Sequence, residues 1–87
     1  MKKLTISYRP LSEVAVNPRN ARTHDKRQLK QIKDSIAAFG FTNPLLVDEA
    51  GVLIAGHGRL SAAKSLGLET VPIIILEHLS ETQKRAL

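Results

Sequence analysis

The best candidate for chemistry in this chain is a turn between an apolar stretch and a helical pattern, Gly56-His57-Gly58-Arg59. A turn that opens a helix exposes free backbone N–H groups at the positive end of the helix dipole, which favours an anion. Glycine allows close approach to a phosphate, Arg59 can donate to it through two N–H groups, and His57 can donate to it or cap the helix. The spacing alone predicts a phosphate site about as readily as a tight turn whose glycines serve geometry, because no Walker lysine or full G-x-G-x-x-G is present.

A second candidate is the polar loop "NPRNARTH", whose basic residues continue into a helical segment. Arg19 and Arg22 can contact phosphates or base edges. Lys26, Lys30 and Lys33 fall on one face of the expected helix and could follow a DNA backbone. Taken alone, a solvated loop and an ordinary charged helix face explain these residues slightly better than a binding surface does.

Other chemistries find little support in the sequence. The 87 residues contain no cysteine, which excludes disulfides, thiolate zinc sites and thiol catalysis, and agrees with a reducing cytoplasm. The three histidines lack a metal-binding spacing such as H-x-x-x-H, and the acids form no set of nucleophile, base and orienting group. No apolar run approaches the ~18 to 20 residues of a membrane span. The segment "MKKLTISYRP" turns polar too early for a signal peptide.

Length and composition indicate one small domain over residues 1–87, since 43% of the residues are hydrophobic and suffice for a single core. The formal net charge of +5 and the sequence pI of about 10.0 favour a polyanionic partner such as nucleic acid, with plain solubility as a nearly equal explanation. Aromatic residues make up only 3% of the chain, which disfavours a platform that stacks single-stranded bases.

Apolar periodicity and turn residues predict an α+β fold of short strands and helices. The predicted strands are residues 4–8, 45–47, 52–55 and 70–76. The predicted helices are residues 25–40, residues from about 57 to 67, and residues from 80 onward. Pro10 should stop the first strand, and Pro72 suggests that the last strand lies at an edge or that the proline marks its entrance. The helix after Ser80 is only about two turns long where the sequence stops, which indicates a piece of a longer protein.

Each predicted helix has recognisable end signals and an apolar face. Capping boxes are expected at Asp25 with Gln28 and at Ser80 with Gln83. Gly40 and Gly67 should end the first two helices, and Leu68 should pack back on the core. One apolar face of the first helix should be formed by Leu29, Ile32, Ile36 and Phe39, and the second helix should face the core with Leu60, Ala63 and Leu66.

The order of these segments resembles the N-terminal domain of the ParB and sulfiredoxin superfamily. This resemblance implies the small α+β fold of that domain, with a short mixed sheet packed against helices. The motifs that carry the resemblance are "NPRNAR", "SIAAFGF", "NPLLVD" and "VLIAGHGRLSAAKSLGLETVPIII", and it extends from about residue 11 to residue 87. Partition ParB proteins carry Gly-Glu-Arg-Arg at the strand-to-helix turn, where the triphosphate of CTP is held. Gly56 and Arg59 match the first and last of these positions, whereas His57 and Gly58 differ from the middle two.

The resemblance implies further site residues and a cofactor. The loop arginine of the family matches Arg22, and Thr42-Asn43-Pro44 falls where the family has another nucleotide-contacting segment. A nucleotide, CTP or ATP, is therefore expected at the turn, with Mg²⁺ only if ligands beyond residue 87 contribute. Sulfiredoxins have their catalytic cysteine at the position of His57, so their chemistry is excluded here.

The sequence "NPRNARTH…FGFTNPLLVDEAGVLIAGHGRLSAAK" is most similar to ParB-like domains of DNA modification methylases, which are often phage-associated. This resemblance implies a non-catalytic, cytoplasmic module that binds a nucleotide or DNA phosphate and helps to place an attached or partner DNA-modifying domain. A homodimer is compatible with this hypothesis. The alternatives are a nucleotide hydrolase, nuclease or small-molecule kinase of the superfamily, and a protein-interaction or dimerisation domain with a vestigial pocket.

Overall fold

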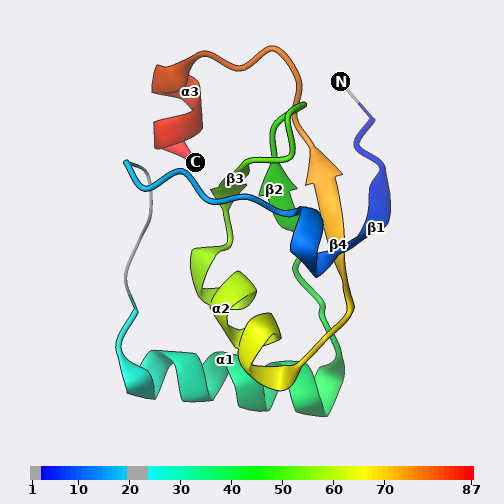
Figure 1. Ribbon diagram of the computed structural model, residues 1–87, viewed down its shortest axis with the longest axis vertical. Coiled ribbons are helices and arrows are strands. Elements are labelled where there is room, and N and C mark those ends of the chain that lie inside the picture. The colour runs from blue at the N-terminus through cyan, green and yellow to red at the C-terminus, as the bar shows by residue number, and fades with distance from the viewer. Residues whose placement is uncertain (1–2, 20–23) are drawn as a thin grey trace.

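The computed structural model describes residues 3–19 and 24–87 of the chain. Its four strands are β1 (Ile6–Pro10), β2 (Leu45–Val47), β3 (Leu53–Ala55) and β4 (Thr70–Ile75), and its helical elements are η1 (Leu11–Glu13, a 3₁₀ turn), α1 (Lys26–Phe39), α2 (His57–Leu66) and α3 (Glu81–Ala86). Helices α1 and α2 lie together at one end of the sheet, and α3 lies at the other end (Figure 1). Within the described ranges, no helix has the length and apolarity that crossing a membrane requires.

The sheet is mixed, with the strand order β1-β4-β2-β3, which confirms the predicted fold class. Strand β4 is antiparallel to β1 and parallel to β2, and β2 and β3 form the predicted hairpin. The prediction that Pro72 marks an edge strand is wrong, because β4 lies between two neighbours. Pro72 pairs with Tyr8 of β1, but the ladder to β2 begins only at Ile73, so Pro72 does mark the entrance to that ladder.

Strand β1 is shifted along the chain relative to the prediction. It includes Pro10, which was expected to stop it, and Pro10 pairs with Thr70 of β4. Because β1 is an edge strand, a proline can be accommodated there without the loss of a second ladder.

The helix ends follow the capping signals. The Asp25 side chain accepts a hydrogen bond of 2.7 Å from the Gln28 N–H, and Ser80 and Gln83 form a complete reciprocal capping box. Gly67 adopts a left-handed conformation with φ of 71° at the end of α2. The capping box at Ser80 and the end of α2 at Gly67 are confirmed, whereas at Asp25 only one of the two hydrogen bonds of the predicted box is present. These features depend on residues within three or four positions of one another.

The core lies between α2 and the sheet. Its buried members are Val14, Leu45, Val47, Leu53, Leu60, Ala63, Val71 and Ile73. The prediction that Leu66 faces the core is wrong, since Leu66 is 37% exposed, and Phe39, at the end of the predicted apolar face of α1, is 77% exposed. Each is the last residue of its helix, and α1 packs mainly on α2 instead of on the sheet, so α1 contributes no fully buried residue.

Candidate functional site

The turn from β3 into α2 is built around Gly56. This residue has φ of 105°, a conformation that L side chains rarely adopt. A Cβ at this position would lie 2.7 Å from Leu45 Cδ2 and 3.0 Å from an Arg59 guanidinium nitrogen. Both the backbone conformation and the available space therefore require glycine at the start of α2.

Gly58 is needed for a different reason. It is helical, but a Cβ there would lie 2.9 Å from Ile32 Cδ1 of α1 and 3.1 Å from two atoms of the His24 imidazole. The absence of a side chain thus allows α1 and the residue before its N-cap to come close to the first turn of α2.

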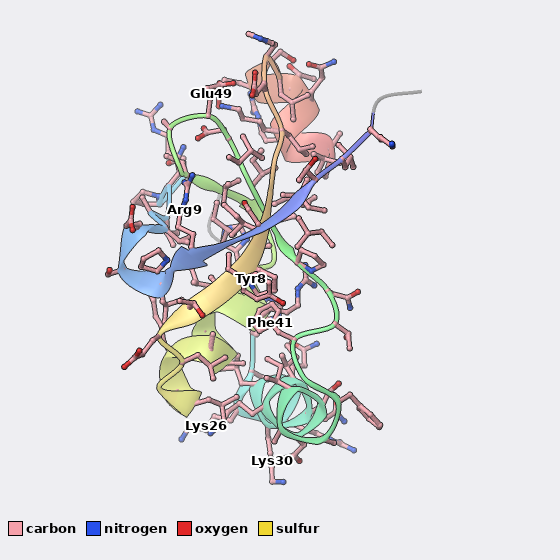
Figure 2. All side chains as sticks on the ribbon, turned by 90° about the vertical axis from the view of Figure 1, so that its right-hand side faces the viewer. Tyr8, Arg9, Lys26, Lys30, Phe41 and Glu49 are labelled. Carbon is pink, nitrogen blue, oxygen red and sulfur yellow. The ribbon has the colours of Figure 1, made fainter. Side chains whose placement is uncertain are left out.

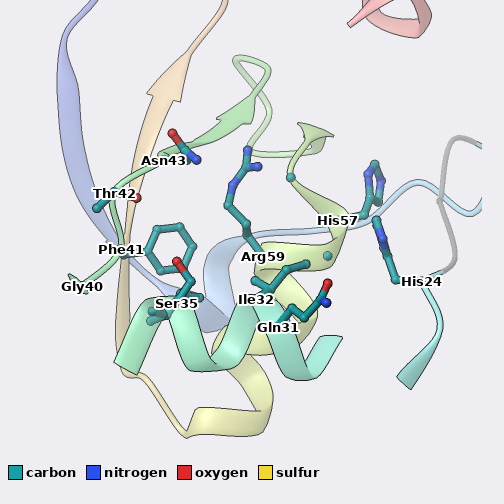
Figure 3. Close-up of a pocket in the computed structure, with 13 residues that line it drawn as sticks. His24, Gln31, Ile32, Ser35, Gly40, Phe41, Thr42, Asn43, His57 and Arg59 are labelled. Atoms are coloured by element: carbon teal, nitrogen blue, oxygen red, sulfur yellow. The ribbon is translucent and has the colours of Figure 1, made fainter. Parts of the chain in front are cut away.

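A cavity of about 390 Å³ opens between α1, the segment after α1 and the N-terminus of α2 (Figure 3). Its lining residues are His24, Gln31, Ile32, Ser35, Ile36, Gly40, Phe41, Thr42, Asn43, Gly56, His57, Gly58 and Arg59. A volume of this size falls within the ~300 to 1,000 Å³ common for small-molecule sites. The structure thus brings together the predicted turn residues 56–59 and the predicted segment at Thr42 and Asn43.

The charges around the cavity favour an anion. Its described lining residues include one guanidinium and two imidazoles but no carboxylate. The four residues of the turn also supply the N-terminus of α2, where the first N–H groups have no partner within the helix. The positive charge of the lining residues and the N–H groups at the start of α2 therefore lie at the same end of the cavity.

Arg59 is the main cation of the site. One of its terminal nitrogens donates a long hydrogen bond of 3.4 Å to the Pro44 carbonyl, and its side chain extends toward Asn43 in Figure 3. Its Nε is buried without a hydrogen-bond partner among the described residues. None of the ion pairs between described residues includes Arg59. Burial lowers the pKa of Arg59, but a guanidinium remains charged at neutral pH. The Arg59 guanidinium is therefore well placed to bind an anionic ligand.

The remaining predicted site residues lie elsewhere. Pro44 contributes its carbonyl to Arg59 but does not line the cavity. Arg22 falls in the segment 20–23, outside the described residues. Arg19 is exposed, and its N–H donates to Asn17 Oδ1 at 3.0 Å within the preceding loop.

The predicted basic helix face is separate from the cavity. Lys26, Lys30 and Lys33 share one side of α1, whereas Ile32 and Ile36 face the cavity. One residue advances an α-helix by about 100°, so the three lysines are centred about 100° around the helix from these isoleucines, and none of them lines the cavity. In Figure 2 Lys30 projects away from the rest of the domain. The domain therefore presents two distinct cationic surfaces.

Sequence reasoning missed the part of the cavity wall that His24, Gln31, Ser35 and Phe41 form. The helical pattern of α1 predicts an amphipathic helix but does not indicate which polar residues border a cavity. Glycine at position 58, within the first turn of a helix, was the one local sign that another group comes close. Among residues 3–19 and 24–87, no group of three or more His, Asp or Glu side chains could hold a metal ion.

Comparison with known proteins decides the family. Residues 2–87 match the family model of the ParB N-terminal domain. The chain belongs to this family. The ParB-like nuclease domain-containing protein YnaK of Escherichia coli (strain K12) is 50% identical to it over 84 residues, which cover 97% of each chain.

Solved structures extend the likeness of this ParB N-terminal domain. The chromosome-partitioning protein ParB from Caulobacter crescentus, complexed with CTP-gamma-S, has a TM-score of 0.82 and 30% identity, covering 94% of this chain and 49% of that one. The present chain thus spans about half the length of that relative. The same Caulobacter protein complexed to the centromeric parS site has a TM-score of 0.73 and 28% identity, covering 91% of this chain and 42% of that one.

Sulfiredoxin from Arabidopsis thaliana has a TM-score of 0.77 and 30% identity, covering 90% of this chain and 91% of that one. The predicted membership of the ParB and sulfiredoxin superfamily is therefore confirmed. The predicted link to DNA modification methylases stays a prediction.

Proposed function

We propose that this ParB N-terminal domain binds the phosphates of a nucleotide in the cavity between α1 and the N-terminus of α2. The observation that carries the proposal is the Arg59 guanidinium, which has no acidic partner among the described residues and a buried Nε without a hydrogen bond. It lies at the N-terminus of α2, where the first backbone N–H groups have no acceptor within the helix and no side chain of the described residues caps them. A phosphate would supply the missing acceptors and the missing negative charge.

The ligand we propose is a nucleoside triphosphate, CTP or ATP. A relative of 30% identity has been solved with CTP-gamma-S, and Gly56 and Arg59 match the ends of the tetrapeptide that the resemblance associates with a triphosphate. Thr42 and Asn43 line the same cavity and would contact the nucleotide beyond its phosphates. Arg22, as the resemblance implies, would be a second clamp.

Isothermal titration with CTP, ATP and inorganic tripolyphosphate tests this site. Arg59→Gln should weaken binding by at least about tenfold, because it removes a charged donor. Arg85→Gln is the matched control, since Arg85 is exposed on α3 at the other end of the sheet. Equal affinity of Arg59→Gln and the unchanged protein would show that the site is wrongly assigned.

We further propose that Arg19, Arg22, Lys26, Lys30 and Lys33 contact a DNA backbone. The support is the positive charge of this region, and a relative has been solved with a DNA site. The resemblance to ParB-like domains of DNA modification methylases favours a role beside a DNA-modifying domain, attached or separate, in the cytoplasm. Affinity purification of the chromosomally tagged protein, with identification of its partners by mass spectrometry, tests this role.

A nuclease is the second candidate function, because the name of the 50% identical relative includes a nuclease domain. A nucleotide hydrolase or small-molecule kinase belongs to the same hypothesis. It predicts Mg²⁺-dependent turnover of DNA, CTP or ATP by the full-length protein, which the binding hypothesis does not require. The absence of turnover of all three would end it.

A protein-interaction or dimerisation domain is the third candidate. Edge strand β1 exposes Ile6 and Tyr8, which are 55% and 72% accessible. The two residues are two positions apart and therefore lie on the same face of the strand. This candidate predicts a mass that rises with concentration and no increase in melting temperature when nucleotides are added.

A further inference from the structure

We infer that His24 contacts the bound anion and makes its capture depend on pH. The inference rests on the proposed function and adds a residue that the sequence did not indicate. It concerns how the cavity between α1 and α2 recognises its ligand.

The position of His24 is the first observation. In sequence it precedes Asp25, the N-cap of α1, but its ring lies against α2. Its Cε1 and Nε2 atoms are each 3.1 Å from the point that a Cβ on Gly58 would occupy. Figure 3 shows the His24 ring at the same side of the cavity as His57. A side chain at position 58 would compete with the imidazole for this space.

The second observation is what the ring lies beside. Gly58 is the second residue of α2, and the N–H groups of the first helical residues have no acceptor within the helix. An anion that accepts hydrogen bonds from these groups comes within reach of the imidazole. His24 is thus placed to add a side-chain donor to a set of backbone donors.

The third observation is the charge of the surroundings. The other charged or titratable groups that line the cavity are His57 and Arg59, both from α2, and the described lining residues of α1 and of the segment 40–43 carry no charge. The neighbouring Asp25 carboxylate accepts a hydrogen bond of 2.7 Å from the Gln28 N–H at the N-cap. A protonated His24 would therefore find its counter-charge in the ligand.

These observations give a direction to the pH dependence. Imidazole is the side chain that ordinarily changes charge between pH 5 and 8, and its protonated form donates from both nitrogens. Anion binding should therefore tighten as the pH falls through this range. The terminal phosphate of a nucleotide gains a proton near pH 6, which acts in the opposite direction.

The test compares His24→Gln with the unchanged chain by calorimetric titration of CTP and inorganic tripolyphosphate at pH 5.5, 6.5 and 8.0. At each pH the dissociation constant of His24→Gln is divided by that of the unchanged chain. This ratio removes the effect of protonation of the probe, which is the same for both proteins. We expect His24→Gln to bind at least about tenfold more weakly at pH 5.5 and within about twofold at pH 8.0. His78→Gln is the control, because His78 is exposed in the loop before α3.

Gly58→Ala provides a second variant that leaves both His24 and Arg59 in the chain. Its methyl group should displace the imidazole, so we expect the same loss of pH dependence, with circular dichroism to check the fold. A His24→Gln protein with the pH dependence of the unchanged chain, and thus a ratio of dissociation constants that is the same at all three pH values, would overturn the inference. Absence of binding at every pH would instead overturn the proposed function itself.

Discussion

Lys84 of α3 forms an ion pair with Asp48 in the β2–β3 hairpin, with 3.0 Å between Nζ and Oδ2. Both side chains are largely buried, with exposed fractions of 15% and 9%. The other carboxylate oxygen accepts hydrogen bonds of 2.9 Å from the N–H groups of Ala50 and Val52. One carboxylate thus shapes the hairpin turn and attaches α3 to it.

Lys84→Met should loosen α3. This helix has no fully buried residue, so the ion pair is a main contact with the rest of the domain, and its removal leaves Asp48 without its charged partner. Hydrogen exchange should show faster exchange of the α3 amides, while the amides of β4 stay protected. Lys64→Met is the control, because Lys64 is exposed on α2. Unchanged exchange in α3 would contradict this prediction.

Asp48 should make stability depend on acid pH. Burial by itself raises the pKa of Asp48, but hydrogen bonds from Val52, Lys84 and Ala50 and the charge of Lys84 outweigh burial and lower the pKa below its ordinary value. A carboxylate with a lowered folded pKa stabilises the fold above its unfolded value, about 3.9, and this contribution is lost as pH falls through the folded pKa.

The measurement for Asp48 is the free energy of unfolding in urea between pH 2 and 7. Asp48→Asn should be less stable than the unchanged chain at pH 7, and the difference should shrink toward pH 2. Asp34→Asn is the control, because Asp34 pairs with Lys30 on the exposed surface of α1 and should change stability by less than about 0.5 kcal/mol. A difference for Asp48→Asn that does not vary with pH would contradict the assignment.

Gly56→Ala should destabilise the domain more than Gly67→Ala. Both glycines have positive φ, 105° and 71°, but a Cβ at Gly67 meets no atom within 4 Å, whereas one at Gly56 lies 2.7 Å from Leu45. The left-handed conformation should cost about 1 to 2 kcal/mol at Gly67, and overpacking should add about 1 to 3 kcal/mol at Gly56. Urea unfolding measures both, and equal losses would show that the Leu45 side chain can adjust.

Replacement of Lys26, Lys30 and Lys33 by alanine should weaken DNA binding and leave nucleotide binding unchanged, because none of these lysines lines the cavity. The logarithm of the DNA association constant decreases with the logarithm of the salt concentration. The magnitude of this slope should become smaller by about 0.9 for each lost phosphate contact. Lys64→Ala serves as the control for a single exposed charge. An unaltered slope would remove the lysine face from the DNA-binding proposal.

Much of the domain could be predicted from the sequence. The caps at Asp25 and Ser80, the hairpin between β2 and β3 and the glycine turn at residue 67 each depend on residues a few positions apart. The likeness of the motifs to a known superfamily added the expected site at residues 56–59. Local hydrogen bonding and backbone preference sufficed for these features.

The tertiary structure alone decided the place of β4 between β1 and β2, the approach of His24 to Gly58, and the pairing of Lys84 with Asp48. It also decided that Phe39, which follows the apolar period of α1, ends in solvent. Each of these relationships joins elements that are distant in the sequence or depends on where a helix ends relative to its neighbour. Local sequence determines how a segment folds, but the simultaneous packing of all segments determines which side chains meet.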